Sequence, residues 1–168
     1  GKNFNQPLDN SLVNCTSLTH ITFGTCFNQP LANSLDNCPS LVHLGLGFNF
    51  NQKLNLPFNI KSLYLNCNSA CCVDNLPDSV EEIEFGPKFN LDLCNLPSSI
   101  KKIKFYIFGR YKRELNCLPD GLEILELPTY YNLQIKNIPR GLKKIICGDS
   151  YKFINDFSDI TVNFHCLL

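Results

Sequence analysis

The sequence lacks an excess of charge of either sign, because its 15 lysine and arginine residues balance its 15 aspartate and glutamate residues. A neutral chain has no overall attraction for nucleic acid or for an anionic membrane surface, so we expect neither as a partner. The sequence also lacks an apolar run near the roughly 18 to 20 residues that cross a bilayer. It does not begin with the charged and then apolar pattern of a signal peptide. These absences favour a soluble globular chain.

The sequence also lacks the motifs that carry common enzyme chemistry. It contains no phosphate-binding loop, dinucleotide-binding glycine pattern, zinc-ligand spacing or nucleophile elbow. His165 and Cys166 are neighbours near Asp159, but adjacent residues of a strand point to opposite faces and do not form a nucleophile and base pair. We therefore expect no enzyme activity, no catalytic residue and no cofactor.

An internal repeat near the N-terminus is the most informative feature that is present. Residues 4–24 and 27–47 are the same at 14 of 21 positions, with a constant offset of 23 residues. A fixed period between about 20 and 50 residues marks units that bury their apolar side only by stacking on their neighbours. The sequence therefore predicts a solenoid.

One apolar pattern, apolar-x-x-apolar-x-apolar, continues beyond this repeat. Its last two apolar positions are two residues apart, which is the period of a β-strand. Copies of one strand that are separated by return segments lie parallel, so we expect one parallel sheet with a strand from each copy. The copies begin at Leu18, Leu41, Ile60, Val80, Ile100, Leu122 and Leu142, and a shortened copy begins at Phe157.

The return segments between these strands carry the triplet Asn-Leu-Pro or a close variant, as at residues 55–57, 75–77, 95–97 and 137–139. Proline opposes helix formation, and a short repeat leaves little room for a helix. We therefore expect a convex side that is extended or 3-10, with little α-helix. Asparagines at equivalent positions of successive turns are expected to bond to one another and to turn backbone.

These motifs resemble a known repeat family. Phe-Asn-Gln-Pro-Leu at residues 4–8 and 27–31, with Asn-Leu-Pro-x-Ser at residues 95–99, is similar to the FNIP repeat, a leucine-rich-repeat-like family of slime moulds and giant amoebal viruses. The Asn-Cys-x-Ser-Leu element at residues 14–18 also resembles the BspA type of leucine-rich repeat. The resemblance implies a right-handed solenoid with a parallel β-sheet on its concave face. It also implies protein binding, often in chains whose F-box recruits a ubiquitin ligase.

We expect residues 1–168 to form a single repeat domain of a longer chain. The repeat array covers about residues 1–148, and residues 149–168 form a C-terminal closing segment. The end of the chain, residues 160–168, is too apolar for a solvated tail. It predicts a strand that covers the last turn.

The ten cysteines and the repeated histidines have structural interpretations. Ten cysteines in 168 residues are fewer than in a small disulfide scaffold, so we expect reduced thiols and a cytoplasmic protein, in the host cytoplasm if viral. Cys15 and Cys38 share one repeat position and are expected to point inward. The vicinal pair at residues 71–72 is expected to fill an aromatic position, with oxidant sensing as the alternative. His20 and His43 are expected to stack about 5 Å apart without binding a metal.

The residues that flank the inward pair of each strand are predicted to face the concave side of the sheet. Charges alternate there from turn to turn, with Glu82 beside Lys102 and with Glu84 beside Lys104 and then Glu126. Opposite charges on neighbouring strands contribute about 0.2 to 1 kcal/mol each and fix strand order. A structural ladder is the leading interpretation, and partner recognition is the alternative.

Residues 105–113 form a second candidate surface, because this segment is two residues longer than the usual period. It concentrates aromatic and arginine side chains, which dominate interface hot spots. Tyr111 takes the position of Phe89, so the segment divides between core filling and binding. The predicted protein-binding residues are Tyr64, Glu84, Lys104, Tyr106, Phe108, Arg110, Tyr111 and Glu126.

The sequence as a whole predicts a protein-protein interaction module that binds another protein of unknown identity. A more specific form of this prediction is the substrate-recognition domain of a ubiquitin-ligase adaptor, which the family resemblance implies. The alternative is a structural or surface repeat protein, for example of a virion or an adhesive layer.

Overall fold

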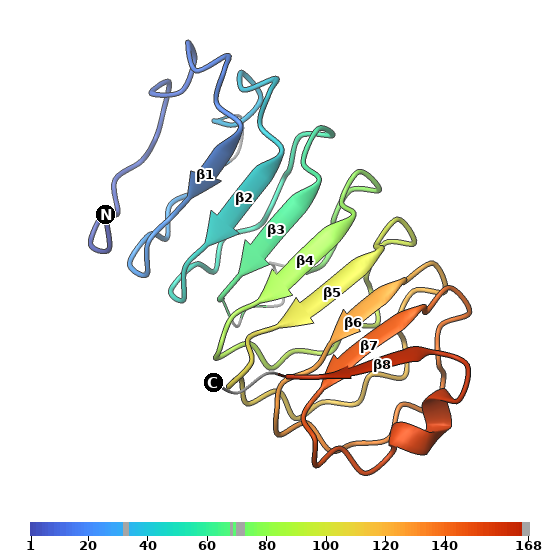
Figure 1. Ribbon diagram of the computed structural model, residues 1–168. Coiled ribbons are helices and arrows are strands. Elements are labelled where there is room, and N and C mark those ends of the chain that lie inside the picture. The colour runs from blue at the N-terminus through green and yellow to red at the C-terminus, as the bar shows by residue number, and fades with distance from the viewer. Residues whose placement is uncertain (32–33, 68, 70–72, 166–168) are drawn as a thin grey trace.

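The computed structural model describes residues 1–31, 34–67, 69 and 73–165, and there the chain winds as a parallel β-solenoid (Figure 1). Its strands form one sheet in the order β1 to β8, and all neighbouring strands are parallel. This confirms the predicted leucine-rich-repeat-like fold with its parallel sheet. The strands are β1 (His20–Thr22), β2 (His43–Leu46), β3 (Ser62–Leu65), β4 (Glu82–Phe85), β5 (Lys102–Phe105), β6 (Ile124–Glu126), β7 (Lys144–Cys147) and β8 (Thr161–Phe164).

The apolar pattern sets the register of the sheet. Ile83 of β4 pairs with Leu63 of β3 on one side and with Ile103 of β5 on the other, and all three side chains are buried. Because alternate side chains of a strand point to opposite faces, this register stacks like side chain upon like. Each turn therefore closes the apolar surface of the turn before it, as expected of units that do not bury a core alone.

A column of aromatic rings runs through the solenoid on the core side of the sheet. Phe89 and Tyr111 stack with ring centroids 6.2 Å apart, and Tyr111 and Tyr131 follow at 6.1 Å. This confirms that Tyr111 takes the position of Phe89. From Tyr111 onward each ring carries a hydroxyl that donates to a carbonyl of the preceding turn, at 3.0 Å for Tyr111 and Leu91. Residues 71–72, predicted to fill this column in the third turn, lie outside the described residues.

Asparagine side chains connect successive turns, as predicted. The backbone N–H of Asn28 donates to Oδ1 of Asn5 at 2.8 Å, and that of Asn51 donates to Oδ1 of Asn28 at 2.9 Å. Each amide oxygen thereby satisfies a backbone donor that a turn leaves without a sheet partner. The same bond to an asparagine Oδ1 recurs at Asn90, Asn116 and Asn132.

The return segments are extended or turned, in agreement with the prediction. In the described residues the helical element is a 3-10 helix, η2 (Ile154–Phe157), whose Phe157 is buried. None of the helices described there is long and apolar enough to cross a membrane. Beyond η2, strand β8 pairs with β7 and places Val162 beside Ile145.

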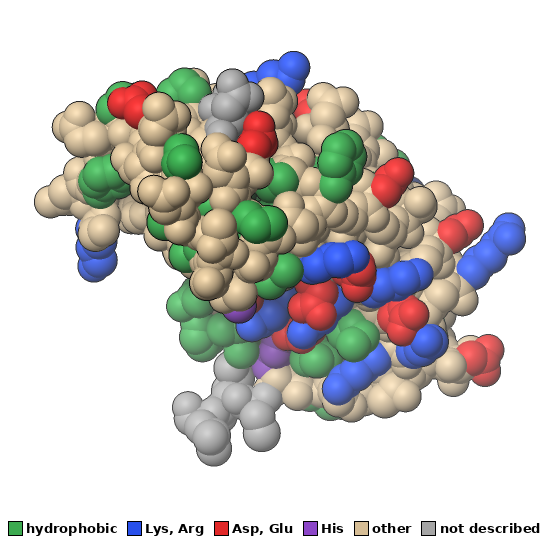
Figure 2. Space-filling model, turned by 90° about the horizontal axis from the view of Figure 1, so that it is seen from above, with side chains coloured by type: hydrophobic (Ala, Val, Ile, Leu, Met, Phe, Trp, Pro, Cys, Tyr) green, Lys and Arg blue, Asp and Glu red, His purple; other side chains and the backbone are tan. Residues whose placement is uncertain are grey.

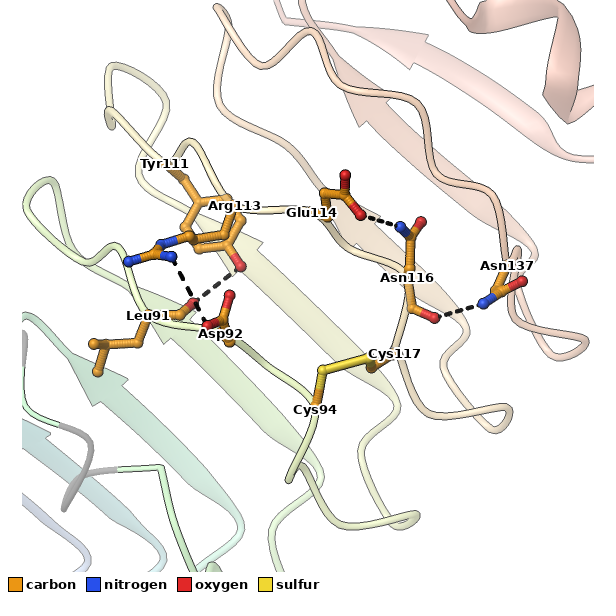
Figure 3. The surroundings of a disulfide bond; sticks show 9 residues. All are labelled: Leu91, Asp92, Cys94, Tyr111, Arg113, Glu114, Asn116, Cys117 and Asn137. Atoms are coloured by element: carbon orange, nitrogen blue, oxygen red, sulfur yellow. Dashed lines mark hydrogen bonds and ion pairs between the residues drawn. A yellow bond between two sulfur atoms is a disulfide. The ribbon is translucent and has the colours of Figure 1, made fainter.

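A disulfide bond corrects one expectation about the cysteines. Cys94 and Cys117, 23 residues apart in the sequence, are joined between the return segments of the fourth and fifth turns (Figure 3). The expectation of reduced thiols is therefore wrong for this pair. Each residue stands shortly before a proline of its own return segment, and stacking brings the two segments together. Cys38 is buried and Cys15 packs against the core, as predicted.

Candidate protein-binding surface

The open face of the sheet carries two rows of side chains whose order follows from the strand register. Lysines and carboxylates alternate along these rows, and Figure 2 shows side chains of both charges interleaved in one band of the surface. The first row contains His20, His43, Ser62, Glu82, Lys102, Ile124 and Lys144. The second row contains Thr22, Gly45, Tyr64, Glu84, Lys104, Glu126 and Ile146.

Ion pairs cross this face between neighbouring turns. Lys104 Nζ lies 3.4 Å from a carboxylate oxygen of Glu84, and Lys102 Nζ lies 3.8 Å from Glu126 on the next strand. The predicted neighbours Glu82 and Lys102 are indeed side by side in the register, but the ion pair of Lys102 is diagonal. Pairs this exposed contribute about 0 to 1 kcal/mol each, which fits a ladder that helps to define strand order.

Four of the predicted binding residues share the second row. Tyr64, Glu84, Lys104 and Glu126 lie on the consecutive strands β3, β4, β5 and β6. All four are partly exposed. Burial raises the pKa of Tyr64, and the charge of Glu84 beside it acts in the same direction. The row is therefore one connected polar surface with a tyrosine at one end.

The two histidines stack as predicted at the start of the sheet. The rings of His20 and His43 are 5.4 Å apart, and His43 Nδ1 lies 3.1 Å from Ser62 Oγ. Burial lowers the pKa of His43, and the neighbouring His20 lowers it further. Within the described residues, no group of three or more metal-ligating side chains surrounds them.

The predicted segment after β5 divides between surface and core. Tyr106, Phe108 and Arg110 are exposed, and the rings of Tyr106 and Phe108 meet edge to face at 6.2 Å. Tyr111 is only 4% exposed and has its hydroxyl bonded to Leu91, so it belongs to the core and not to the predicted surface set. The side chains that face solvent are the ones on either side of it.

The exposed segment belongs to a longer rim, of which the sequence predicted Tyr106, Phe108 and Arg110 but not Phe48 and Lys88. We call this the aromatic-basic rim. Lys88 Nζ lies 4.4 Å above the ring of Phe48, a cation–π contact between two different turns. Counting positions after each strand would have found these residues, because both follow the end of a strand by two or three residues. The rim comprises Phe48, Lys88, Tyr106, Phe108, Arg110, Lys112 and Tyr130.

Two hollows lie along this rim. The first, of about 600 Å³, is lined by Pro87, Lys88, Asn90, Phe108, Arg110 and Lys112. The second, of about 260 Å³, is lined by Tyr111, Lys112, Tyr130, Tyr131, Asn132 and Leu133. Lys112 belongs to both, so the hollows adjoin across the fifth and sixth turns.

A solenoid with one short parallel strand per turn, stacked through apolar columns, defines a leucine-rich-repeat-like protein. The family model described as FNIP Repeat matches residues 50–88 and 68–107. Residues 50–107 therefore carry FNIP repeats, which confirms the predicted resemblance. FNIP repeats and leucine-rich-repeat-like solenoids are non-enzymatic scaffold families, and such solenoids are commonly protein-interaction scaffolds.

A solved structure supports the same assignment. CroV588 of a giant virus, described as a novel circular LRR protein, is similar to this chain at a TM-score of 0.65 and 26% sequence identity. The similarity covers 98% of this chain and 29% of that chain. The chain thus spans less than a third of the length of the protein it matches. No curated protein matches the chain.

Proposed function

We propose that this solenoid binds another protein through the open face of its sheet and the aromatic-basic rim beside it. One observation carries the proposal: Tyr106 and Phe108 are 40% and 54% exposed on a segment that also exposes Arg110. Tyrosine and arginine are the residue types that concentrate binding energy in protein interfaces. The core takes Phe105 and Tyr111 from this segment, and the exposed rings of Tyr106 and Phe108 are not part of it.

The sheet face supports the same proposal. A rigid parallel sheet presents Tyr64, Glu84, Lys104 and Glu126 at fixed spacing, so little conformational entropy is lost when a partner docks. The exposed ion pairs of this row exchange partners easily, because each contributes little to folding. Substrate recognition for a ubiquitin ligase is the specific role that the family resemblance implies. We place the interaction in the cytoplasm, in that of the host if the protein is viral.

Affinity capture with matched variants tests the proposal. Immobilised wild-type protein is compared with Tyr106→Ala, Arg110→Ala and the control Phe58→Ala, which removes an 87% exposed ring on a return segment. We expect a defined protein that wild type and the control capture equally and that both rim variants capture several-fold less from an amoebal lysate. Circular dichroism checks that all four proteins are folded.

Each other outcome has a distinct meaning. Capture that is equal for all four proteins means that the rim is not part of the interface. Recovery only with particles or membranes favours a structural or surface role in place of the proposed one. Thiol titration of the isolated protein tests the location, because mostly paired cysteines would contradict a cytoplasmic setting.

A further inference from the structure

The first hollow of the aromatic-basic rim differs in its charge from the rest of the surface. Three cations, Lys88, Arg110 and Lys112, line it, and no carboxylate does. Elsewhere in the described residues five lysines and arginines form ion pairs, as in Lys61 with Glu81 at 2.6 Å. The three cations of the hollow have no ion pair among the described residues. In a chain with equal numbers of acidic and basic residues, this is a local concentration of unpaired positive charge.

The hollow is held open by bonds between its two turns. The backbone N–H of Lys112 donates to Oδ1 of Asn90 at 2.9 Å. The hydroxyl of Tyr111 donates to the Leu91 carbonyl at 3.0 Å, as Figure 3 shows. Residues on both sides of Tyr111 therefore have fixed backbone positions over the fourth turn. Preorganised cations lose less entropy on binding than cations on a mobile loop.

The lining of the hollow also contains two apolar residues, Pro87 and Phe108. Phe108 is 54% exposed, and Lys112 also lines the second hollow with the exposed ring of Tyr130. A ligand that fits must bring negative charge to the three cations and an apolar side chain to Phe108. An extended peptide does this, because alternate side chains along an extended chain point in opposite directions.

The surrounding charges favour a short acidic segment over a nucleic acid strand. Asp92 lies two residues after Asn90, and its carboxylate oxygen is 3.9 Å from a guanidinium nitrogen of Arg113. Glu114 lies two residues after Lys112. A phosphate backbone that runs along the turns would meet these carboxylates. Proteins that bind single strands instead line a continuous groove with positive charge.

We propose that the hollow lined by Lys88, Phe108, Arg110 and Lys112 binds an extended acidic segment of a partner protein. Carboxylates of that segment pair with the three cations, and one of its apolar side chains covers Phe108. This inference rests on the proposed protein-binding function and specifies the chemistry of the partner.

Fluorescence anisotropy with defined probes tests the inference. The probes are a labelled peptide of about ten residues with Asp and Glu around a Leu-Phe pair, the same peptide with Asn and Gln instead, and an oligothymidylate of similar length. We expect wild type to bind the acidic peptide at least about ten-fold more tightly than the neutral one, an affinity ratio set by the charges. This preference should fall as salt is raised.

A matched pair of variants shows where the peptide binds. Arg110→Glu with Lys112→Glu should weaken binding of the acidic peptide by at least about ten-fold, because carboxylates of the protein then face those of the peptide. The control, Lys53→Glu with Lys136→Glu, changes net charge equally at exposed lysines outside the hollow and should leave the affinity near that of wild type. Equal loss in both double variants would mean a nonspecific charge effect and would overturn the inference.

The remaining outcomes also decide the question. Equal binding of the acidic and neutral peptides, no binding of either, or tighter binding of oligothymidylate than of the acidic peptide would each overturn the inference. The proposed function is judged separately, by capture with the Tyr106 and Arg110 variants. If that capture depends on the rim while the acidic peptide does not bind, protein binding stands and the acidic partner is wrong.

Discussion

Substitutions at Arg110 and Tyr111 separate the surface of the rim from its core. These neighbours in sequence have opposite environments: Arg110 is exposed, whereas Tyr111 is 4% exposed. The ring of Tyr111 has Phe89 at 6.2 Å and Phe105 at 4.5 Å, and its hydroxyl bonds to Leu91. We therefore expect Tyr111→Ala to lower the free energy of unfolding by about 3 to 5 kcal/mol, the range for a buried aromatic side chain.

Two matched changes resolve this cost into its parts. Tyr111→Phe keeps the ring and leaves the Leu91 carbonyl without its donor, which costs about 1 kcal/mol for one hydrogen bond. Arg110→Ala removes an exposed side chain and should change stability by less than about 0.5 kcal/mol. The order of stability is then Arg110→Ala, Tyr111→Phe and Tyr111→Ala, from most to least stable.

Urea unfolding followed by circular dichroism measures these differences. For a domain of this size the free energy changes by about 1 to 3 kcal/mol per molar urea, so Tyr111→Ala should lower the midpoint by at least about 1 M. If Tyr111→Ala unfolds at the same urea concentration as Arg110→Ala, the assignment of Tyr111 to the core is refuted. An effect of Tyr111→Phe as large as that of Tyr111→Ala would also refute it, because the ring would then contribute nothing.

Three further predictions concern the sheet, the histidine row and the disulfide. Ile83→Asp places an unpaired charge at a side chain that is 1% exposed and should lower the free energy of unfolding by several kcal/mol. The control Phe58→Asp, at an exposed ring, should unfold like wild type. Equal melting temperatures of the two variants would contradict the register. The pKa of His43 is lowered from 6.5, so the unfolded chain takes up the proton first. Stability should therefore fall as pH drops through 6.5, and a slope unchanged by His43→Gln would contradict this. Replacing Cys94 and Cys117 by Ser removes a cross-link between residues 23 positions apart and should lower the free energy of unfolding by about 3 kcal/mol under oxidising conditions. In reductant the variant and wild type should be equally stable. Equal stability under oxidising conditions would refute the bond.

The fold was predictable from the sequence because its core is one-dimensional. Stacking requires the same kind of side chain at the same place in every turn, so Leu63, Ile83 and Ile103 reveal their register by spacing alone. The closing strand was predictable for the same reason, because Val162 continues the column of Ile145. Local spacing is enough where each turn contacts only its neighbours.

The proposed binding surface was only partly predictable, because it depends on contacts between turns at positions that do not repeat. The cluster of Lys88 with Arg110 and Lys112 forms where the longer fifth turn stacks on the fourth, and the extra residues of the fifth turn break the period that would align them. The disulfide was not predicted from the sequence for a related reason. Cys94 stands three residues before its proline and Cys117 two residues before its own, so they do not share a repeat position.

The core of the fifth turn determines how its surface is displayed. Tyr111 is buried between two exposed residues, as in a strand, so its anchoring forces Arg110 and Lys112 outward onto the same side. The hydroxyl of Tyr111 fixes this arrangement to the preceding turn, where Phe89 has no equivalent group. A longer turn with a tyrosine in the aromatic column thus brings two cations and Phe108 into the lining of one hollow. In this solenoid a departure from the repeat period creates the surface that we propose a partner binds.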